Sequence, residues 1–153
     1  MYRAYSNAES CEADRKTIAS GVNSLDLMER AGNALFLKVV SAMEKIGADE
    51  ALFVLGGGNN AGDGFVAARK LSERSVKVSA LCLENRFSDD CKEMRSRYRG
   101  EILTSIPKKK FPLIVEFFER SETAYFIRRN GIGKRHELRR VFDGFFKIFK
   151  RFL

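Results

Sequence analysis

A glycine-rich stretch at residues 55–70, LGGGNNAGDGFVAARK, constrains the fold of this chain more than any other feature. An apolar run at residues 51–55 leads into it, and a helix-like run at residues 65–71 leads out. Glycines allow the backbone to adopt positive φ and to approach a ligand closely. A continuously apolar strand followed by such a turn and a helix is typical of a parallel α/β sheet, whose ligands bind at the carboxyl ends of the strands.

The remaining sequence continues this alternation of strands and helices. Apolar and small side chains three or four apart predict a long helix that begins at Ser24 and that Gly47 ends. This pattern predicts a parallel sheet with right-handed crossovers. The stripe consists of Leu25, Met28, Gly32, Leu35, Val39, Met43 and Ile46. The other predicted elements are helices at residues 7–19, about 62–74 and 88–98, and strands at residues 51–55, 76–83 and 113–118.

The glycine turn can be compared with known phosphate-binding patterns. A P-loop needs a lysine and a hydroxyl residue directly after its last glycine, but here Gly62 is followed by Asp63 and Gly64, which excludes that pattern. A dinucleotide-binding pattern can be placed on Gly56, Gly58 and Ala61. In that case Glu84, after the next strand, would bind the ribose.

The dinucleotide pattern is a weak match because it leaves Asn59, Asn60 and Asp63 without a role. A third interpretation uses them all. Backbone amides at a helix N-terminus hold a phosphate, while oxygens of an asparagine and of the acid bind a cation or take part in proton transfer. The alternative for Asp63 is structural, since an acid in the first turn of a helix satisfies amide groups and suits the helix dipole.

Two separate motifs resemble one family. GGGNNAGDGFVAARKL is similar to the G-x-GNNGGDG signature of the NAD(P)H-hydrate epimerase family, also called the YjeF N-terminal domain. SNAESCEADRKTIASGVNSLDLMERAG resembles the opening of the same family. The resemblance covers residues 5 to about 83, and residues 113–118 loosely. It implies a three-layer α/β/α, Rossmann-like domain, commonly a homodimer, which interconverts the R and S forms of hydrated NADH and NADPH so that a separate dehydratase can restore them.

The resemblance also implies roles for individual residues. The signature carries substrate binding over to Asn59, Asn60, Ala61, Gly62 and Asp63, with Ala61 in place of the usual glycine. Asn60 is expected to help bind one potassium ion per subunit. Asp63 is the candidate for proton transfer, because epimerising a carbon that bears a hydroxyl needs an acid and a base nearby.

The family pattern is incomplete after about residue 118. Its third strand normally ends in V-D-x-x-x-G-x-G, and IVEFFERSETA sets Glu116 at the position of the acid, a second potassium ligand, without a glycine loop. A second alignment, which matches residues 130–132 to the end of the pattern, sets Tyr125 there instead. A later D-x-P-S-G segment is not found before Leu153. We therefore expect a family domain at residues 1–118 that is incomplete at its C-terminus, and a divergent helical segment at residues 119–153.

The net charge of +8 comes from residues 108–153, which hold 13 basic and 5 acidic side chains, whereas residues 1–107 hold 15 of each. Nine of the 13 phenylalanines lie at residues 108–153 too, and residues 135–153 predict a basic amphipathic helix. We expect it to pack on the sheet, with binding to a membrane surface or to a partner as alternatives. No nucleic-acid-binding motif accompanies the charge.

Cysteine spacing and hydropathy bear on disulfides, zinc binding and the location of the protein. Three cysteines without CxxC spacing indicate neither a disulfide framework nor a zinc site. No signal peptide or long apolar segment is recognisable, so a cytoplasmic protein is expected. The resulting hypothesis is a cytoplasmic NAD(P)H-hydrate epimerase. The alternative is a catalytically impaired module of the same family that binds a nucleotide or a partner.

Overall fold

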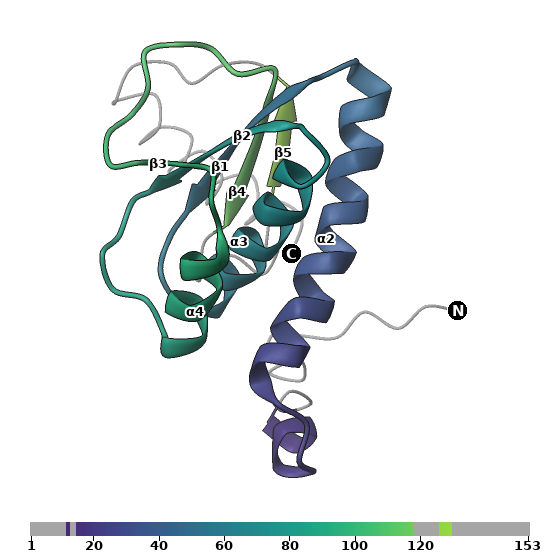
Figure 1. Ribbon diagram of the computed structural model, residues 1–153, viewed down its shortest axis with the longest axis vertical. Coiled ribbons are helices and arrows are strands. Elements are labelled where there is room, and N and C mark those ends of the chain that lie inside the picture. Colours follow the sequence, from purple (N-terminus) through teal and green to yellow (C-terminus); the bar gives the residue numbers. More distant parts are fainter. Residues whose placement is uncertain (1–11, 13–14, 118–125, 130–153) are drawn as a thin grey trace, which may run out of the picture.

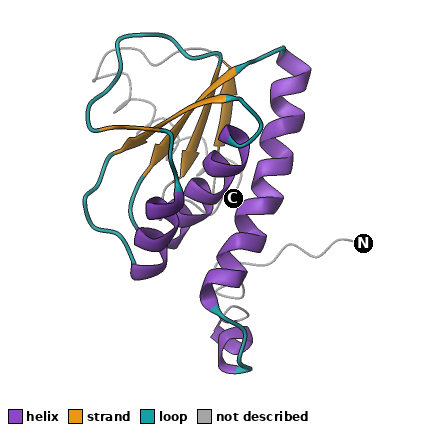
Figure 2. Ribbon diagram, in the orientation of Figure 1, coloured by secondary structure: helices purple, strands orange, loops and turns teal. Residues whose placement is uncertain are grey.

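The computed structural model describes residues 12, 15–117 and 126–129 (Figure 1). Helices and strands alternate along most of this part of the chain, as the sequence predicts (Figure 2). The elements are α2 (Ser24–Ile46), β1 (Glu50–Leu55), α3 (Gly58–Ser72), β2 (Lys77–Cys82), α4 (Asp89–Arg97), β3 (Glu101–Leu103), β4 (Leu113–Phe117) and β5 (Phe126–Arg129).

The strands form one sheet in the order β3-β2-β1-β4-β5. β1 pairs in parallel with both β2 and β4, and β2 pairs in parallel with β3, which confirms the predicted α/β fold. β5 is antiparallel to β4. Because the chain moves outward from β1 to β3 and then returns to the other side of β1, the direction of winding reverses between β1 and β4. Such a switch point is where open α/β sheets bind ligands, beyond the carboxyl ends of the strands.

Helix α2 shows why the sequence signals for its ends were reliable. The Asn23 side chain accepts a hydrogen bond from the Leu25 amide at 2.8 Å and caps the start of the helix. Gly47 ends it at φ 64°, a left-handed conformation that glycine adopts without strain. The predicted stripe is buried or packed on the core, so α2 lies against the neighbouring helix with its apolar face.

The two faces of the sheet are covered differently. Phe53 and Leu55 of β1 and Val115 of β4 belong to a large core cluster that includes the buried side chains of α2, α3 and α4. These three helices lie together on that face (Figure 2). Leu52 and Val54 point to the opposite face, in a smaller cluster with side chains of β2, β4 and the segment before β4.

The structure corrects some predictions about the helices and strands, and others concern residues that it does not describe. The sequence analysis missed β3, whose three residues are too few to show an alternating pattern, and β5, which adds four residues beyond position 118 to the same sheet. Helix α3 begins four residues earlier than expected. The expected helix at residues 135–153, and most of the one at residues 7–19, lie outside the described residues. Within the described ranges no helix is both long and apolar enough to cross a membrane.

Candidate functional site

The glycine turn lies where β1 ends and α3 begins, at the carboxyl edge of the sheet. Gly58, at φ 69°, turns the chain into the helix, and Gly57 precedes it as a cap without a side-chain hydrogen bond. The early start of α3 corrects the sequence analysis, which placed the asparagines in the turn before a helix from about residue 62. Asn59 and Asn60 are instead in the first turn of a helix, whose amide groups carry partial positive charge at this edge.

A segment that follows β2 closes against this turn. The Leu83 amide donates a hydrogen bond to the Leu55 carbonyl oxygen at 2.9 Å. A Cβ atom placed on Gly57 would lie 2.8 Å from Glu84 Oε2 and 2.6 Å from the Arg86 carbonyl oxygen. The close approach therefore requires glycine at position 57. It also brings the Glu84 carboxylate to the N-terminus of α3, where an anion is stabilised by the helix dipole.

Asn59 is the exposed member of the predicted substrate-binding set, and its side chain is held in place. Ser88 Oγ donates a hydrogen bond to Asn59 Oδ1 at 2.8 Å. The same hydroxyl oxygen accepts a hydrogen bond from the Cys91 amide at 3.3 Å, so Ser88 also caps α4. With Oδ1 engaged by Ser88, the Nδ2 amide of Asn59 is the group that can bind a ligand at this edge.

The other predicted residues of the turn are less exposed. Ala61 is fully buried in the core, and Gly62 is buried beneath Met28 of α2. Their side-chain positions contact protein, so any contact with substrate would have to come from their backbone. Asn60 and Asp63 are partly buried, and both interact with neighbouring groups.

Asp63 is not in the first turn of α3, which contains no acid, so the capping role considered for it is wrong. The helix begins at Gly58, and Asp63 therefore lies more than one turn further along. The negative charge of Asp63 helps to raise the pKa of the Cys91 thiol of α4. Asp63 thus lies on the side of α3 that faces α4.

Glu116 is buried near the carboxyl end of β4, directly opposite Val54 of β1. Val54 belongs to the smaller cluster, and residues paired across two strands share a face. Glu116 therefore leaves the sheet on the face opposite α3, whereas Asn60 belongs to α3 itself. Carboxylate and carboxamide oxygens are suitable ligands for a hard cation. A cation held by both would have to lie at the carboxyl edge, where the two faces meet. Within the described ranges, no group of three or more His, Cys, Asp and Glu side chains could hold a metal ion.

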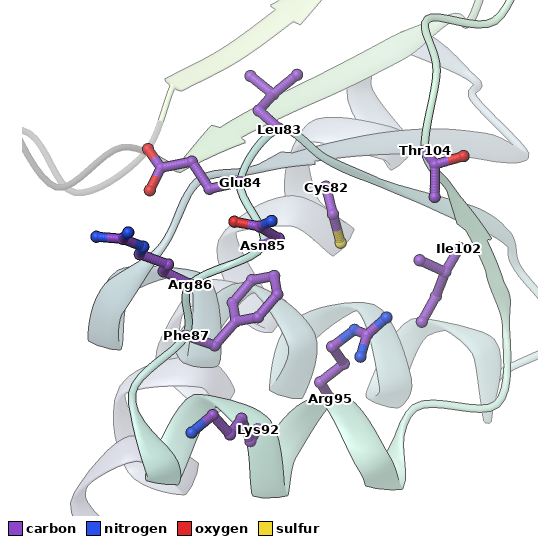
Figure 3. Close-up of a pocket in the computed structure, with 10 residues that line it drawn as sticks. All are labelled: Cys82, Leu83, Glu84, Asn85, Arg86, Phe87, Lys92, Arg95, Ile102 and Thr104. Atoms are coloured by element: carbon purple, nitrogen blue, oxygen red, sulfur yellow. The ribbon is translucent and has the colours of Figure 1, made fainter.

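An open cavity of about 760 Å³ lies beside the turn, beyond the ends of β2 and β3 (Figure 3). Arg95 extends into it from α4, and Phe87 lies between Arg95 and Arg86 in this view. The residues that line the cavity are Cys82, Leu83, Glu84, Asn85, Arg86, Phe87, Lys92, Arg95, Ile102 and Thr104. Apart from Glu84, which the dinucleotide-binding pattern placed at the ribose, none of them was predicted from the sequence as a site residue.

The two thiols near this cavity are protonated at neutral pH. Burial raises the pKa of the Cys91 thiol to about 12, and the neighbouring Cys82 adds to the effect. Burial also raises the pKa of Cys82, although a hydrogen bond with Arg95 and the charge of Arg95 lower it in part. Neither cysteine has the lowered pKa of a reactive thiol, so neither is a candidate nucleophile.

Residues 24–127 match the sequence profile of the family described as YjeF-related protein N-terminus. The match spans more than half of the chain and contains α2, the glycine turn and the whole sheet apart from the last two residues of β5. The chain belongs to this family. The resemblance is therefore confirmed for the glycine-rich signature and for the part of the N-terminal motif from residue 24 onward.

Similar proteins carry related names. An NAD(P)H-hydrate epimerase of Lentilactobacillus buchneri is 40% identical over 86 residues, which make up 56% of this chain and 40% of that protein. The Bifunctional NAD(P)H-hydrate repair enzyme Nnr of Coxiella burnetii is 37% identical over 75 residues, 49% of this chain and 15% of that protein. The chain thus spans less than half the length of these curated relatives. The crystal structure of yeast ynu0, YNL200c, is similar with a TM-score of 0.58 and 22% identity, over 67% of this chain and 47% of that one, which supports the α/β fold of this YjeF-related chain.

Sequence reasoning missed Ser88 and the arginines of the cavity. Ser88 precedes two aspartates, a recognisable helix cap, but nothing in its local sequence connects it with Asn59, 29 positions away. Arg86 and Arg95 come from different elements, and their positions in the sequence form no motif. Glu84 was considered only as part of the weak dinucleotide pattern.

Proposed function

We propose that this chain is an NAD(P)H-hydrate epimerase, an isomerase that interconverts the R and S forms of hydrated NADH and NADPH. The observation that carries the proposal is the family's asparagine and glycine signature, which lies at the carboxyl edge of β1 in a chain that belongs to the family. The names of the relatives from Lentilactobacillus buchneri and Coxiella burnetii support the same activity.

In this proposal the N-terminus of α3 binds the pyrophosphate of the nucleotide. Amide groups of the first turn, beginning at Gly58, provide hydrogen bonds and the positive end of the helix dipole. Asn59, oriented by Ser88, offers its Nδ2 amide to a substrate oxygen. Glu84 lies against Gly57 and would have to turn away from the helix end before a phosphate could bind there.

Asp63 is the proposed proton-transfer residue. Inversion at a carbon that bears a hydroxyl needs a group that takes a proton and a group that returns one. Asp63 is the acid of the signature, and its partly buried position on α3 protects it from bulk water.

The potassium ion implied by the family would be held by Asn60 and Glu116. The oxygen donors of both residues suit an ion of this kind, and Glu116 brings a buried negative charge to the carboxyl end of β4. A bound cation would supply positive charge near the substrate phosphates. The homodimer, the cytoplasmic location and the link to an NAD(P)H-hydrate dehydratase remain predictions, and the bifunctional name of the Coxiella burnetii relative supports the link.

A direct test starts from one purified epimer of hydrated NADH and follows the appearance of the other by chromatography. We expect the chain to accelerate the approach to equilibrium, and Asp63→Asn to lower kcat by about 10²- to 10⁴-fold, the usual contribution of a general acid or base. Glu44→Gln, an exposed carboxylate on α2, is the matched control and should be as active as the unchanged chain. Circular dichroism verifies that both variants fold.

Three results of this test bear on the proposal. No acceleration by the folded chain would refute the epimerase assignment, and binding of the substrate without turnover would instead favour the impaired nucleotide-binding module. Full activity of Asp63→Asn would remove Asp63 from proton transfer. Replacement of potassium by sodium should lower the rate, and a rate independent of the ion would reject the cation site at Asn60 and Glu116.

A further inference from the structure

The cavity beyond β2 and β3 has no role in the proton transfer proposed above. Its volume, about 760 Å³, lies within the range of roughly 300–1,000 Å³ that is typical of sites for small molecules. It combines an aromatic ring, aliphatic surface and several charged groups, as ligand pockets commonly do. The charges indicate which kind of ligand would fit.

Two arginines of the cavity form no salt bridge with any acid in the part of the chain that the structure describes. Arg95 lies close enough to Cys82 to influence its pKa and lies over the Phe87 ring, with its Cζ atom 5.5 Å from the ring centre. Within the described ranges neither Arg95 nor Arg86 forms a salt bridge, whereas Lys92 is paired with Asp89 at 2.7 Å. Cys82 is neutral at neutral pH, so it does not balance the charge of Arg95. Arg95 is thus positioned by neutral groups and remains available for an anion.

The cavity lies next to the proposed pyrophosphate site. The segment that begins at Leu83 lines the cavity and contacts the turn at Leu55 and Gly57. In doubly wound sheets a dinucleotide on the first glycine turn extends its ribose over the end of the next strand. Here that strand is β2, and the cavity lies at its end.

The ribose could be recognised in two ways. An acid at the end of β2 binds the free ribose hydroxyls, whereas an arginine accommodates a phosphate on the 2′ oxygen. Glu84 is such an acid, but its carboxylate lies against Gly57 at the helix end. Figure 3 shows Arg95 on the other side of Phe87, directed toward Cys82 inside the cavity. An arginine that binds phosphate with two parallel hydrogen bonds gives both affinity and selectivity.

We propose that this cavity binds the adenosine ribose of the nucleotide and that Arg95 binds its 2′-phosphate, so that the chain prefers NADPH hydrate to NADH hydrate. This inference rests on the proposed function for the identity of the nucleotide. The phosphate contact itself is independent of the reaction and can be measured without it.

The experiment compares two probes that lack nicotinamide, adenosine 2′,5′-bisphosphate and adenosine 5′-monophosphate, by isothermal titration calorimetry on the full chain. We expect the bisphosphate to bind at least about tenfold more tightly, the size of one charge-assisted contact. In Arg95→Gln the ratio of the two affinities should fall to near one, and Arg95→Lys should recover part of it. Arg99→Gln, an exposed arginine just beyond α4, is the control and should keep the ratio.

The outcomes separate this inference from the proposed function. Equal affinities for the two probes in the unchanged chain, or an unchanged ratio in Arg95→Gln, would overturn the inference even if the chain is an active epimerase. A ratio that depends on Arg95 would support it even if no epimerisation occurs. A tighter complex with the monophosphate that weakens in Glu84→Gln would assign the ribose hydroxyls to Glu84 and also overturn the proposal.

Discussion

Arginine side chains have different partners in two regions of this molecule. Where α2, α3 and α4 meet, Arg69 contacts Glu29 and Glu73, each at 2.8 Å, and Arg97 contacts Glu29 at 3.3 Å and Glu93 at 3.0 Å. At the carboxyl edge of the sheet, the arginines of the cavity have no carboxylate partner among the described residues.

The difference separates structural charge from charge that can bind a ligand. One nitrogen of Arg69, Nη2, donates hydrogen bonds to both carboxylate oxygens of Glu29. This partly buried ion pair joins α2 to α3. An ion pair of this kind leaves little attraction for an incoming anion. An unpaired arginine in an open cavity contributes little to stability but can bind a phosphate. Substitutions in the two regions should therefore affect different measurements.

The largest effect is expected where α2 crosses α3. A Cβ atom on Gly32 would overlap Val66 Cβ and lie 2.8 Å from the Asp63 carbonyl oxygen, and neither atom can move without displacing the helix. Gly32→Ala should therefore lower the free energy of unfolding by about 3 kcal/mol, the upper end of overpacking in a core. Urea unfolding monitored by circular dichroism measures the change.

Gly62→Ala is the matched control for this crossing. Its added Cβ would meet the end of the flexible Met28 side chain, which can rotate away. Alanine also favours a helix over glycine, by up to about 1 kcal/mol, so the net change should be small. Equal losses for Gly32→Ala and Gly62→Ala would show that the close approach of the two helices is not what limits stability.

Arg69→Met is expected to have the next largest effect. The substitution keeps an apolar stem but leaves the partly buried Glu29 with the longer contact to Arg97 alone. We expect a loss of about 1–2 kcal/mol, less than for a fully buried pair because both groups retain some contact with water. Arg95→Gln should change stability by less than about 0.5 kcal/mol, as for most surface substitutions. A similar loss of stability in Arg69→Met and Arg95→Gln would contradict the distinction between the two regions.

Much of the fold could be predicted because its signals are local. The stripe of α2 and its stop at Gly47, and the apolar runs of β1 and β4, are each contained in a short segment of sequence. The start of α3 could not be predicted in this way. Glycines and asparagines disfavour a helix, but burial of Ala61 and the contact of Gly62 with Met28 outweigh that preference.

The candidate site, too, could be predicted from the sequence only where the signal is local. The position of the glycine turn at the edge of the sheet followed from the order of strand, turn and helix, and the structure confirms it. The face on which Glu116 lies depends on its register opposite Val54, which the sequence alone does not specify. The cavity is formed by side chains of three different segments, so its arginines could be recognised only after those segments had been placed together.

An effect at or below the lower end of that for Arg69→Met is expected at the boundary of the two regions, where Ser88 caps α4 and holds Asn59. Ser88→Ala should lower the free energy of unfolding by about 1 kcal/mol, the usual value of a helix cap. It should also raise KM for the hydrated nucleotide, because Asn59 loses the hydroxyl that orients it. Ser88→Thr, which keeps both contacts, should behave like the unchanged chain.

Ser88→Asp separates the two roles of this residue. Aspartate is a good helix cap, so Ser88→Asp should regain the free energy of unfolding that Ser88→Ala loses. Its carboxylate, however, cannot donate a hydrogen bond to Asn59 Oδ1. Chemical unfolding and steady-state kinetics on the same preparations distinguish the possibilities. If KM returns to its original value together with stability, Ser88 acts only through α4, and the orientation of Asn59 does not require its hydroxyl. A raised KM in a fully stable Ser88→Asp variant would show that the helix cap and the substrate site depend on one side chain through two different hydrogen bonds.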